Sequence, residues 1–371
     1  MTSQRQEAML DFLRDAGWEN CPLSPLPGDA STRRYFRTSR NGTSAMLMDQ
    51  PQNAELPQCP ATATPEERQA LGYNAMARLA GADCGRFVAA ADYLRSQQLS
   101  APQIYHADPH NGFVLLEDFG DDLYGSVLDS GESERALYAA AIDALVHLHQ
   151  NPGPALLDRD HPLHAYDSTA MIAETDLMTE WFMPLALGRD ATDEERGEHR
   201  ALWMDVLQLP VDRYTVFVHR DYHAQNLFWL PQRKEAQRVG MIDFQDAVAG
   251  MRSYDLVSLL EDARRDVPAS LSRAMTQRYV ERMCRNGQPI NADDFQAEFA
   301  VMAAQRNAKI AGIFARLYLR DGKPRYLGFL PRVWKYLEQD LAHPAIPALK
   351  RWYDGKIPPE LRTNFRIGAA A

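Results

Sequence analysis

The residue types best suited to chemistry are gathered in two short stretches of the second half of the chain. A polar stretch, residues 219–226, follows a short apolar run and contains Asp221 and Asn226. A second apolar run ends on Asp243, 17 residues after Asn226. Both apolar runs are typical of short buried strands. Because the ends of neighbouring strands leave polar side chains exposed at one edge of a sheet, we expect these three residues to lie close together.

Carboxylate and carboxamide oxygens suit Mg²⁺, which keeps several waters and takes further ligands from phosphates. Asn226 and Asp243 therefore predict a magnesium site, and Asp221 is left free to orient a nucleophilic hydroxyl. A positioned nucleophile, a metal ion and neutralised charge are the parts that phosphoryl transfer requires. Each acid alone is more simply read as a solvated loop residue. The joint pattern, with apolar strands on both sides, favours phosphotransferase chemistry.

A third candidate is a turn near the N-terminus. Residues 28–32 read Gly-Asp-Ala-Ser-Thr and are followed by Arg33 and Arg34. Small residues let backbone N–H groups approach phosphates, the hydroxyls of Ser31 and Thr32 add donors, and the arginines add charge. The stretch suits a loop that covers phosphates. The alternative is a simple hairpin turn with surface arginines.

Hydrophobic periodicity predicts an α+β protein with a small strand-rich part followed by a large helical part. The expected strands are 34–38, 44–48, 113–116, 216–218 and 239–242, with a hairpin turn at Asn41-Gly42. The expected helices cover the first 20 residues, 84–97, a segment from 133, 167–187, 193–208, 252–264, 268–286, 293–320 and 331–341. A loop is expected over residues 49–66, which are rich in Pro, Gln and Ala.

Composition narrows the class of function. Forty Lys and Arg residues against 50 Asp and Glu give a net charge of −10, which disfavours binding to nucleic acid or to anionic lipid. No apolar stretch approaches the ~18 residues of a membrane span, and the first residues lack the order of a signal peptide. The four cysteines lie far apart and form no metal-binding pair. We expect a cytoplasmic protein with neither a membrane nor a nucleic-acid partner.

The pattern H-x-D-x-x-x-x-N from His219 to Asn226, followed by the strand-terminal Asp243, resembles the aminoglycoside phosphotransferase and choline kinase superfamily. This resemblance implies a two-lobed, protein-kinase-like fold. Its small antiparallel-sheet lobe, residues 1–118, would bind the nucleotide phosphates. Its mainly helical lobe, residues 119–371, would carry the catalytic loop and a sugar site. ATP and Mg²⁺ are the implied cofactors.

The same resemblance assigns roles to single residues. Asp221 would be the catalytic base, and Asn226 and Asp243 the magnesium ligands. Main-chain groups near Glu117 and Phe119, in the segment that resembles the hinge between lobes, would contact adenine. A protein kinase is disfavoured, because Gln replaces the Gly of the D-F-G pattern and no long activation segment follows.

Two departures from the superfamily pattern concern the phosphate-binding charge. The third strand usually carries a Lys, but residues 46–49 read Met-Leu-Met-Asp. The following helix usually carries a Glu that pairs with this Lys, and residues 87–92 offer none. Losing both together is consistent, since an orphaned buried Glu would be costly. We hypothesise that Arg33 or Arg34 neutralises the phosphates instead.

Several stretches resemble one branch of the superfamily, the anomeric N-acetylmuramate/N-acetylglucosamine kinases of bacterial cell-wall recycling. They are residues 28–37, 46–49, 242–247, 254–264 and 305–314. The resemblance implies transfer of the γ-phosphoryl group of ATP to the C1 hydroxyl of an amino sugar by a monomeric enzyme.

Three further residues are candidates for contact with the sugar. His223 lies in the catalytic loop. Trp181 either lines the substrate site or packs in the core. Arg306 shares a helix face with a lysine three residues on, and either meets the lactyl carboxylate of N-acetylmuramate or lies on a solvated face.

Two other functions stay open at this point. An aminoglycoside or another small alcohol could be the acceptor, because a net charge of −10 does not forbid an acidic pocket. A nucleotide-binding pseudokinase is a different class of function. The missing Lys and Glu are its only support, and intact Asp221, Asn226 and Asp243 argue against it.

Overall fold

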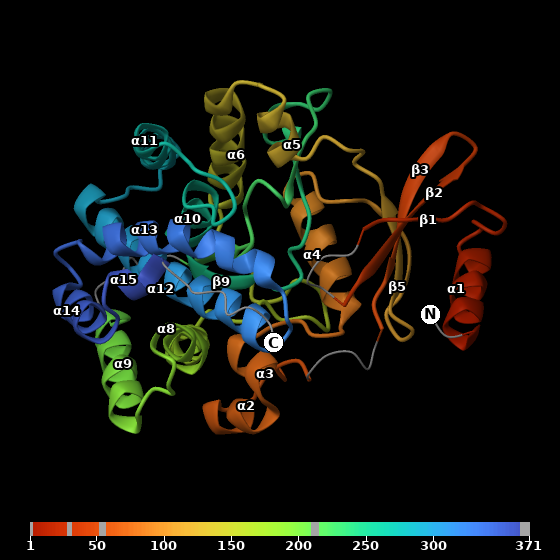
Figure 1. The fold of residues 1–371 in the computed structure, drawn as a ribbon. Coiled ribbons are helices and arrows are strands. Elements are labelled where there is room, and N and C mark those ends of the chain that lie inside the picture. The colour runs from red at the N-terminus through yellow and green to blue at the C-terminus, as the bar shows by residue number, and fades with distance from the viewer. Residues whose placement is uncertain (1–2, 28–31, 52–56, 209–214, 364–371) are drawn as a thin grey trace. The chain divides into compact units, whose positions relative to one another are not determined.

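The structure is a computed structural model that describes residues 3–27, 32–51, 57–208 and 215–363 (Figure 1). The chain divides into two compact units. The first unit comprises residues 1–164 and 219–249, and the second comprises residues 165–218 and 250–371. The predicted lobe boundary after residue 118 stays a prediction.

The first unit is built on an antiparallel five-stranded sheet with the order β1-β2-β3-β5-β4. Its strands are β1 (Ser24–Pro25), β2 (Arg34–Arg40), β3 (Thr43–Asp49), β4 (Ile104–Asp108) and β5 (Phe113–Glu117). The β2–β3 hairpin turns at Asn41 and Gly42, which have φ angles of +50° and +81°. Such left-handed residues match the twist of a hairpin, as the Asn-Gly pair predicts.

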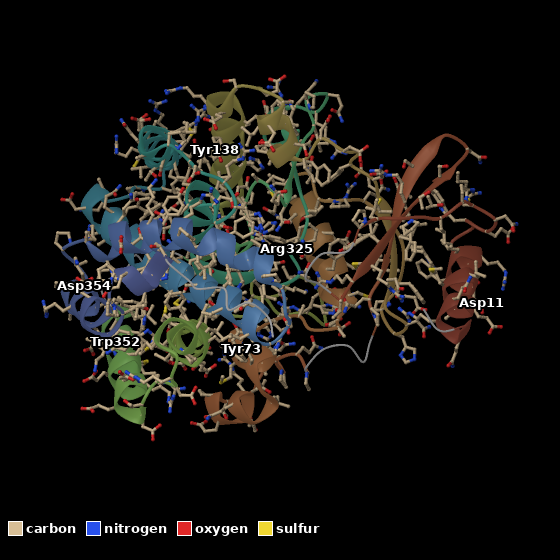
Figure 2. All side chains as sticks on the ribbon, in the orientation of Figure 1. Asp11, Tyr73, Tyr138, Arg325, Trp352 and Asp354 are labelled. Atoms are coloured by element: carbon tan, nitrogen blue, oxygen red, sulfur yellow. The ribbon has the colours of Figure 1, made fainter. Side chains whose placement is uncertain are left out.

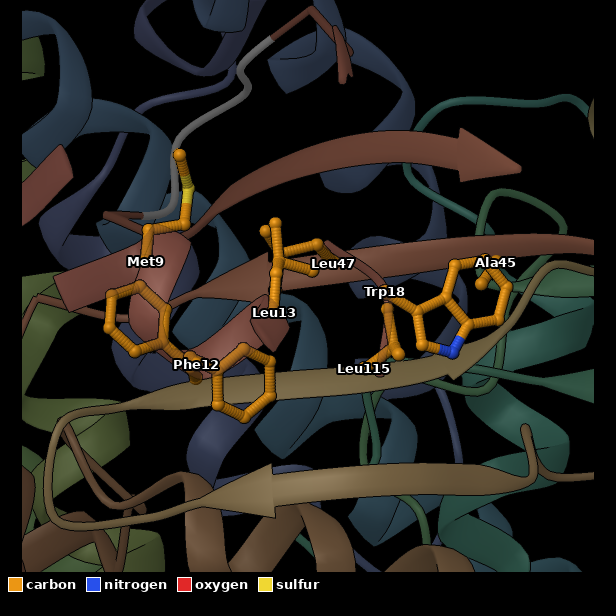
Figure 3. Packing of buried hydrophobic residues seen from close by; sticks show 8 residues of the cluster. Met9, Phe12, Leu13, Trp18, Ala45, Leu47 and Leu115 are labelled. Atoms are coloured by element: carbon orange, nitrogen blue, oxygen red, sulfur yellow. The ribbon is translucent and has the colours of Figure 1, made fainter. Parts of the chain in front are cut away.

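Helix α1 (Ser3–Asp15) packs on one face of this sheet. Met9, Phe12 and Leu13 of the helix are buried with Leu47 of β3 and Leu115 of β5 (Figure 3). Side chains alternate along β5, so Val114 and Leu116 lie on the opposite face of the sheet, towards α4. Leu10 of α1 is 50% exposed, because it lies on the outer face of that helix.

The rest of the first unit is helical apart from one short hairpin. Its helices are α2 (Pro65–Leu71), α3 (Tyr73–Ala77), α4 (Cys84–Ser96), α5 (Tyr124–Asp129), α6 (Glu134–Leu148) and the 3₁₀ helix η2 (Glu235–Arg238). Strands β7 (Leu227–Trp229) and β8 (Val239–Met241) pair antiparallel. This hairpin separates the two chemistry-bearing stretches, so their ends meet at one place.

The second unit is mainly helical. Its elements include α7 (Ser168–Leu177), the π-helix η1 (Met178–Phe182), α8 (Met183–Leu187), α9 (Asp193–Val206), α10 (Ser253–Leu260), α11 (Ala269–Arg285), α12 (Ala292–Leu319), the 3₁₀ helix η3 (Pro324–Phe329), α13 (Leu330–Leu341), α14 (Pro347–Lys356) and α15 (Glu360–Thr363). Strand β6 (Thr215–Val218) pairs with β9 (Val248–Met251), which crosses the unit boundary. Trp352 and Asp354 project from α14 (Figure 2), and the Trp352 ring packs against His199 of α9.

The predicted α+β class, with a small antiparallel sheet before a large helical part, is confirmed. The predicted strands and long helices are present, and a capping box of Thr192 and Glu195 starts α9. The segment 167–187 is not one helix, because a π-helical turn interrupts it at residues 178–182. Among the described residues, no helix is both long enough and apolar enough to cross a membrane.

Gly312 gives a stability prediction in the second unit. A Cβ at this position of α12 would come within 2.5 Å of the backbone of Leu177 in α7. Gly312→Ala should therefore lower the free energy of unfolding by about 1–3 kcal/mol, although alanine is the better helix former. Gly197 of α9 has open space around it, so Gly197→Ala should raise stability by up to ~1 kcal/mol. Urea unfolding of both variants measures the two changes, and equal signs would contradict the packing argument.

Candidate active site

The loop of residues 219–226 begins with a conformation that few side chains adopt. Arg220 has a φ of +73° and is buried, and its Nη1 donates to the backbone oxygen of Ala77 at 3.0 Å. The hydroxyl of Tyr222 donates to the backbone oxygen of Ala141 in α6 at 2.9 Å. These two anchors turn the chain sharply and leave Asp221 half-buried between them.

The structure brings the three predicted polar residues together. The side-chain nitrogen of Asn226 donates to the backbone oxygen of Asp221 at 3.0 Å and to Oδ2 of Asp243 at 3.3 Å. The backbone N–H of Ile242 donates to the backbone oxygen of Asn226 at 3.1 Å, which holds the two stretches side by side. Asn226 is thus the centre of the cluster.

Asp243 also has a left-handed backbone, with a φ of +66°, and 41% of its side chain is exposed. Gln245 donates to its Oδ1 at 3.0 Å. Partial removal of water by the surrounding protein disfavours the charged carboxylate and raises the pKa of Asp243. The charge of Arg33 opposes this shift, and the neighbouring carboxylate of Asp221 adds to it. A bound cation would relieve the same repulsion between carboxylates.

The donor set fits a magnesium ion. Both carboxylate oxygens of Asp243 lie beside Asn226 or Gln245, and the amide oxygen of Asn226 has no hydrogen-bond partner within the described part of the chain. No group of three or more His, Cys, Asp or Glu residues that could hold a metal occurs among the described residues. Mg²⁺ does not need such a group, because one or two protein oxygens suffice when phosphates and waters complete its shell.

Arg33 reaches this cluster from the N-terminal turn. Its Nη1 lies 3.2 Å from Oδ1 of Asp243, and its Nε donates to Oε1 of Gln50 at 2.7 Å. Gln50 is buried and also donates to the hydroxyl of Thr32 at 3.2 Å. The guanidinium is therefore held beside the proposed metal ligand, and Thr32 stands next to it. Ser31 lies outside the described residues.

Arg34 points to a different partner. It pairs with Asp49 at the end of β3, and Asp49 is fully buried. Arg5 of α1 binds the other oxygen of Asp49 at 2.6 Å. Arg34 therefore belongs to a structural ion-pair network. Of the two arginines that the sequence offered as phosphate ligands, the geometry favours Arg33.

Glu117 and Phe119 follow the buried strand β5, as expected. The backbone N–H of Glu117 donates to Gln103 at 2.8 Å, so that group is already used within the protein. The ring of Phe119 packs edge-on against Phe228 at 5.6 Å, and a Cβ at Gly240 would approach it to 3.0 Å. Contact of the main chain near Glu117 and Phe119 with adenine stays a prediction.

The two histidines of the loop are both buried. Burial lowers the pKa of His219 to about 4, so it is neutral at pH 7 and packs edge-on against Tyr222. Nδ1 of His223 accepts from the backbone N–H of Gln225 at 3.3 Å, and its ring lies beside Asn226. These contacts suit bracing of the loop. Contact of His223 with a sugar stays a prediction.

Comparison with known proteins agrees with this geometry. A model of the phosphotransferase enzyme family matches residues 22–289. The N-acetylmuramate/N-acetylglucosamine kinase of Caulobacter vibrioides is 43% identical over 98% of this chain and 99% of that protein. The chain belongs to the phosphotransferase enzyme family. A second relative, the N-acetylmuramate/N-acetylglucosamine kinase of Pseudomonas putida, is 33% identical over 91% of this chain and 90% of its own length.

Solved structures of the phosphotransferase family share the fold. A choline/ethanolamine kinase family protein from Mesorhizobium loti superposes with a TM-score of 0.56 at 13% identity, covering 95% of this chain and 99% of that one. An ADP-bound aminoglycoside phosphotransferase, APH(2'')-Ib, gives a TM-score of 0.53 at 15% identity, covering 91% and 97%. At this identity the likeness shows the fold alone, which is kinase-like as the motifs predict.

Two candidate substrate residues of this phosphotransferase lie in the second unit. Trp181 is half-buried on the π-helix η1, a type of turn that often occurs at functional sites. Its neighbours Phe182 and Met183 are fully buried and belong to the core. Arg306 of α12 is 4% exposed, so the alternative of a solvated face is wrong.

Arg306 is a buried guanidinium in a region that also holds two buried acids, Glu261 and Asp340. Its Nε and Nη1 are buried and have no hydrogen-bond partner among the residues that the structure describes. Asn307 donates to Glu261 at 2.7 Å and to Asp340 at 2.9 Å. Burial raises the pKa of Glu261 to about 7, and burial together with Glu261 raises that of Asp340. Burial thus disfavours the charged forms of both acids, which weakens the compensation that they can offer to the guanidinium.

Sequence reasoning missed several residues that hold the cluster in place. They are Gln50, Arg86, Arg220 and Gln245. A usable signal existed for Arg86, which lies next to the apolar run Phe87–Ala91 of α4. Gln50 carries no such signal, because its role appears only when the end of β3 meets the N-terminal turn.

Replacing the two arginines separately distinguishes their roles. Arg33→Met should weaken ADP binding in EDTA about 10-fold or more, the effect of losing one charged hydrogen bond to phosphate. Arg34→Met should leave ADP affinity within twofold but lower the free energy of unfolding by about 1–3 kcal/mol, because Asp49 loses one of its two partners. Calorimetric titration and urea unfolding measure both effects. The reverse assignment would show weakened ADP binding in the Arg34 variant.

Proposed function

We propose that this phosphotransferase is an ATP-dependent kinase that phosphorylates the anomeric C1 hydroxyl of N-acetylmuramate and N-acetylglucosamine. The observation that carries the proposal is the cluster of Asp221, Asn226 and Asp243 within the first unit. The 43% identity with the Caulobacter vibrioides kinase over almost the whole chain supports the choice of an amino sugar as acceptor.

In the proposed reaction, the C1 oxygen of the sugar forms a bond to the γ-phosphorus of ATP. The bond between this phosphorus and the β–γ bridging oxygen breaks, and ADP leaves. Asp221 accepts the proton of the C1 hydroxyl as the new bond forms, a role in general base catalysis that requires direct hydrogen bonding to that hydroxyl. The product is a glycosyl phosphate.

Charge neutralisation is divided between the chain and a metal ion. Asn226 and Asp243 would hold Mg²⁺, which supplies positive charge to the phosphates as negative charge shifts to ADP. Arg33 stands in the place of the missing Lys and would meet the phosphates from the N-terminal turn, with Gln50 fixing its direction. Thr32, and Ser31 beside it, would add hydroxyl donors.

The remaining parts of the proposal follow from the substrates. A reaction that consumes ATP and free amino sugars places the protein in the cytoplasm, where both are small molecules in solution. The acidic balance fits neither a nucleic-acid nor a membrane partner. We propose that it acts as a monomer, since all three residues of the cluster come from one chain.

The proposal predicts the behaviour of an Asp221 variant. Asp221→Asn should lower kcat about 10²–10⁴-fold, the usual contribution of a general base, because the amide cannot take the hydroxyl proton. ADP affinity should stay within twofold, since Asp221 is assigned no nucleotide contact. Release of ADP is measured with N-acetylmuramate, N-acetylglucosamine and kanamycin as acceptors.

Each alternative function has its own signature in this experiment. If ADP is released with kanamycin as acceptor but with neither amino sugar, the protein is an aminoglycoside kinase. Magnesium-dependent ADP binding without turnover on any acceptor would identify a pseudokinase. A variant that keeps more than about a tenth of wild-type kcat would exclude Asp221 as the base.

Arg306 generates a prediction about selectivity. A buried guanidinium with two unsatisfied N–H groups suits the lactyl carboxylate, which N-acetylglucosamine lacks. Arg306→Met should raise KM for N-acetylmuramate about 10-fold and leave KM for N-acetylglucosamine within twofold. Arg320→Met is the matched control, because Arg320 lies just after the end of α12 and pairs with Asp321. An equal rise for both sugars would show that Arg306 does not read the carboxylate.

A further inference from the structure

Helix α4 carries one buried charge, Arg86, whose hydrogen bonds within the described part of the chain all go to backbone oxygens. Nε donates to the oxygen of Gln245 at 3.3 Å and Nη2 to that of Ala247 at 3.3 Å. Nη1 donates to the oxygen of Pro162 at 3.1 Å. Two of these three acceptors lie just after Asp243, so the guanidinium clamps the segment that carries the proposed metal ligand.

Other contacts join the same helical region to the same segment. Phe87 of α4 stacks on Phe244 with ring centroids 4.9 Å apart. Oδ1 of Asp246 accepts from the backbone N–H of Ala80 at 2.6 Å. Arg220 donates to the oxygen of Asp246 as well as to that of Ala77. Residues 244–247 are therefore held in contact with α4 and with the chain around residues 77–80.

A guanidinium at this position is not a favourable packing choice by itself. Arg86 is 3% exposed, and burial lowers its pKa, while the acidic side chains of Asp246 and Asp83 oppose that shift. Backbone oxygens satisfy its N–H groups but carry no formal charge. What this arrangement provides is a rigid, three-pronged link that a hydrocarbon side chain could not form.

The link also accounts for the backbone of Asp243. A φ of +66° is uncommon for a residue other than glycine and persists only where surrounding contacts enforce it. The contacts of Arg86 with Gln245 and Ala247 begin two residues later and fix the direction in which the chain leaves Asp243. Losing them would let the chain relax and would move the carboxylate away from Asn226.

We propose that Arg86 is a positioning residue that sets Asp243 for metal binding. Helix α4 acts on the site through the backbone of residues 243–247 and touches neither the metal nor the phosphates. The inference rests on the proposed function only in taking Asp243 as a metal ligand.

Three variants of the full chain test the proposal. Arg86→Met removes all three hydrogen bonds, and Arg86→Lys keeps the charge but cannot reach the three oxygens together. Arg362→Met is the matched control, because Arg362 is also a buried arginine that donates to backbone oxygens, those of Ile357 and Tyr353 in the second unit. Any effect of losing a buried arginine in general appears in the control as well.

The first readout needs neither metal nor nucleotide. Amide hydrogen exchange of residues 243–249 should quicken at least 10-fold in Arg86→Met and less in Arg86→Lys, under conditions in which each variant is folded. Exchange of the same residues should be unchanged in Arg362→Met. Unaltered exchange in Arg86→Met would overturn the proposal, because the clamp would then not hold the segment.

The second readout is the gain in ADP affinity on adding Mg²⁺, measured by calorimetry against EDTA. In Arg86→Met, the increase in ADP affinity on adding Mg²⁺ should be at least 10-fold smaller than in wild type. ADP affinity in EDTA should stay within twofold of wild type. An undiminished gain, or an equal loss in Arg362→Met, would overturn the positioning role. If wild type itself shows no gain, the metal assignment of the proposed function fails, while hydrogen exchange still decides whether the clamp exists.

Discussion

One carboxylate, that of Asp243, sets the main constraint on the first unit. Its side chain is partly exposed, as the proposed magnesium ligand has to be, although other acids lie close to it and its backbone is in the left-handed region. Neither condition is favourable by itself. The neighbouring residues Arg33, Asn226 and Gln245 offset the charge, and the packing of Phe244 on α4 fixes the chain. Most of the polar contacts around the site can be understood as support for this one side chain.

Arginine serves this unit in three ways that depend on its surroundings. Arg33 lies beside a partly exposed carboxylate, where phosphate can compete for it. Arg34 pairs with the fully buried Asp49 and holds β2 and β3 together with α1. Arg86 donates only to backbone oxygens of the described residues and fixes a turn. The residue type alone does not separate these roles, and burial and partners do.

The sequence predicted the parts of the protein whose signals are local. Strands, long helices and the Asn41-Gly42 turn follow from periodicity and turn chemistry, and the spacing of Asp221, Asn226 and Asp243 was enough to predict that they meet. The π-helical turn at residues 178–182 was missed, because its residues have ordinary helical character. The choice between Arg33 and Arg34 also needed the structure, since the two residues are adjacent in the sequence and only the positions of Asp49 and Asp243 show which arginine meets which acid.

The buried polar side chains of α12 are a second feature that the sequence did not predict. Lys309 pairs with the fully buried Glu174 at 2.9 Å, to which Gln305 also donates, while Asn307 bridges Glu261 and Asp340. In the sequence this helix offered either a substrate contact or a solvated face. The structure shows a third possibility for most of these residues, a polar network inside the helical core. Such networks are stabilising only when their members find partners, and among the described residues Nε and Nη1 of Arg306 have none.

The most direct test of the account is a phosphorus NMR spectrum of the protein with Mg-ATP and N-acetylmuramate. The account predicts an acid-labile sugar phosphate whose phosphorus signal is split by the anomeric proton, together with an equal amount of ADP. A phosphate ester coupled to any other proton of the sugar would contradict transfer to the C1 hydroxyl. ATP that stays unchanged with both amino sugars would contradict the proposed function of the cluster itself.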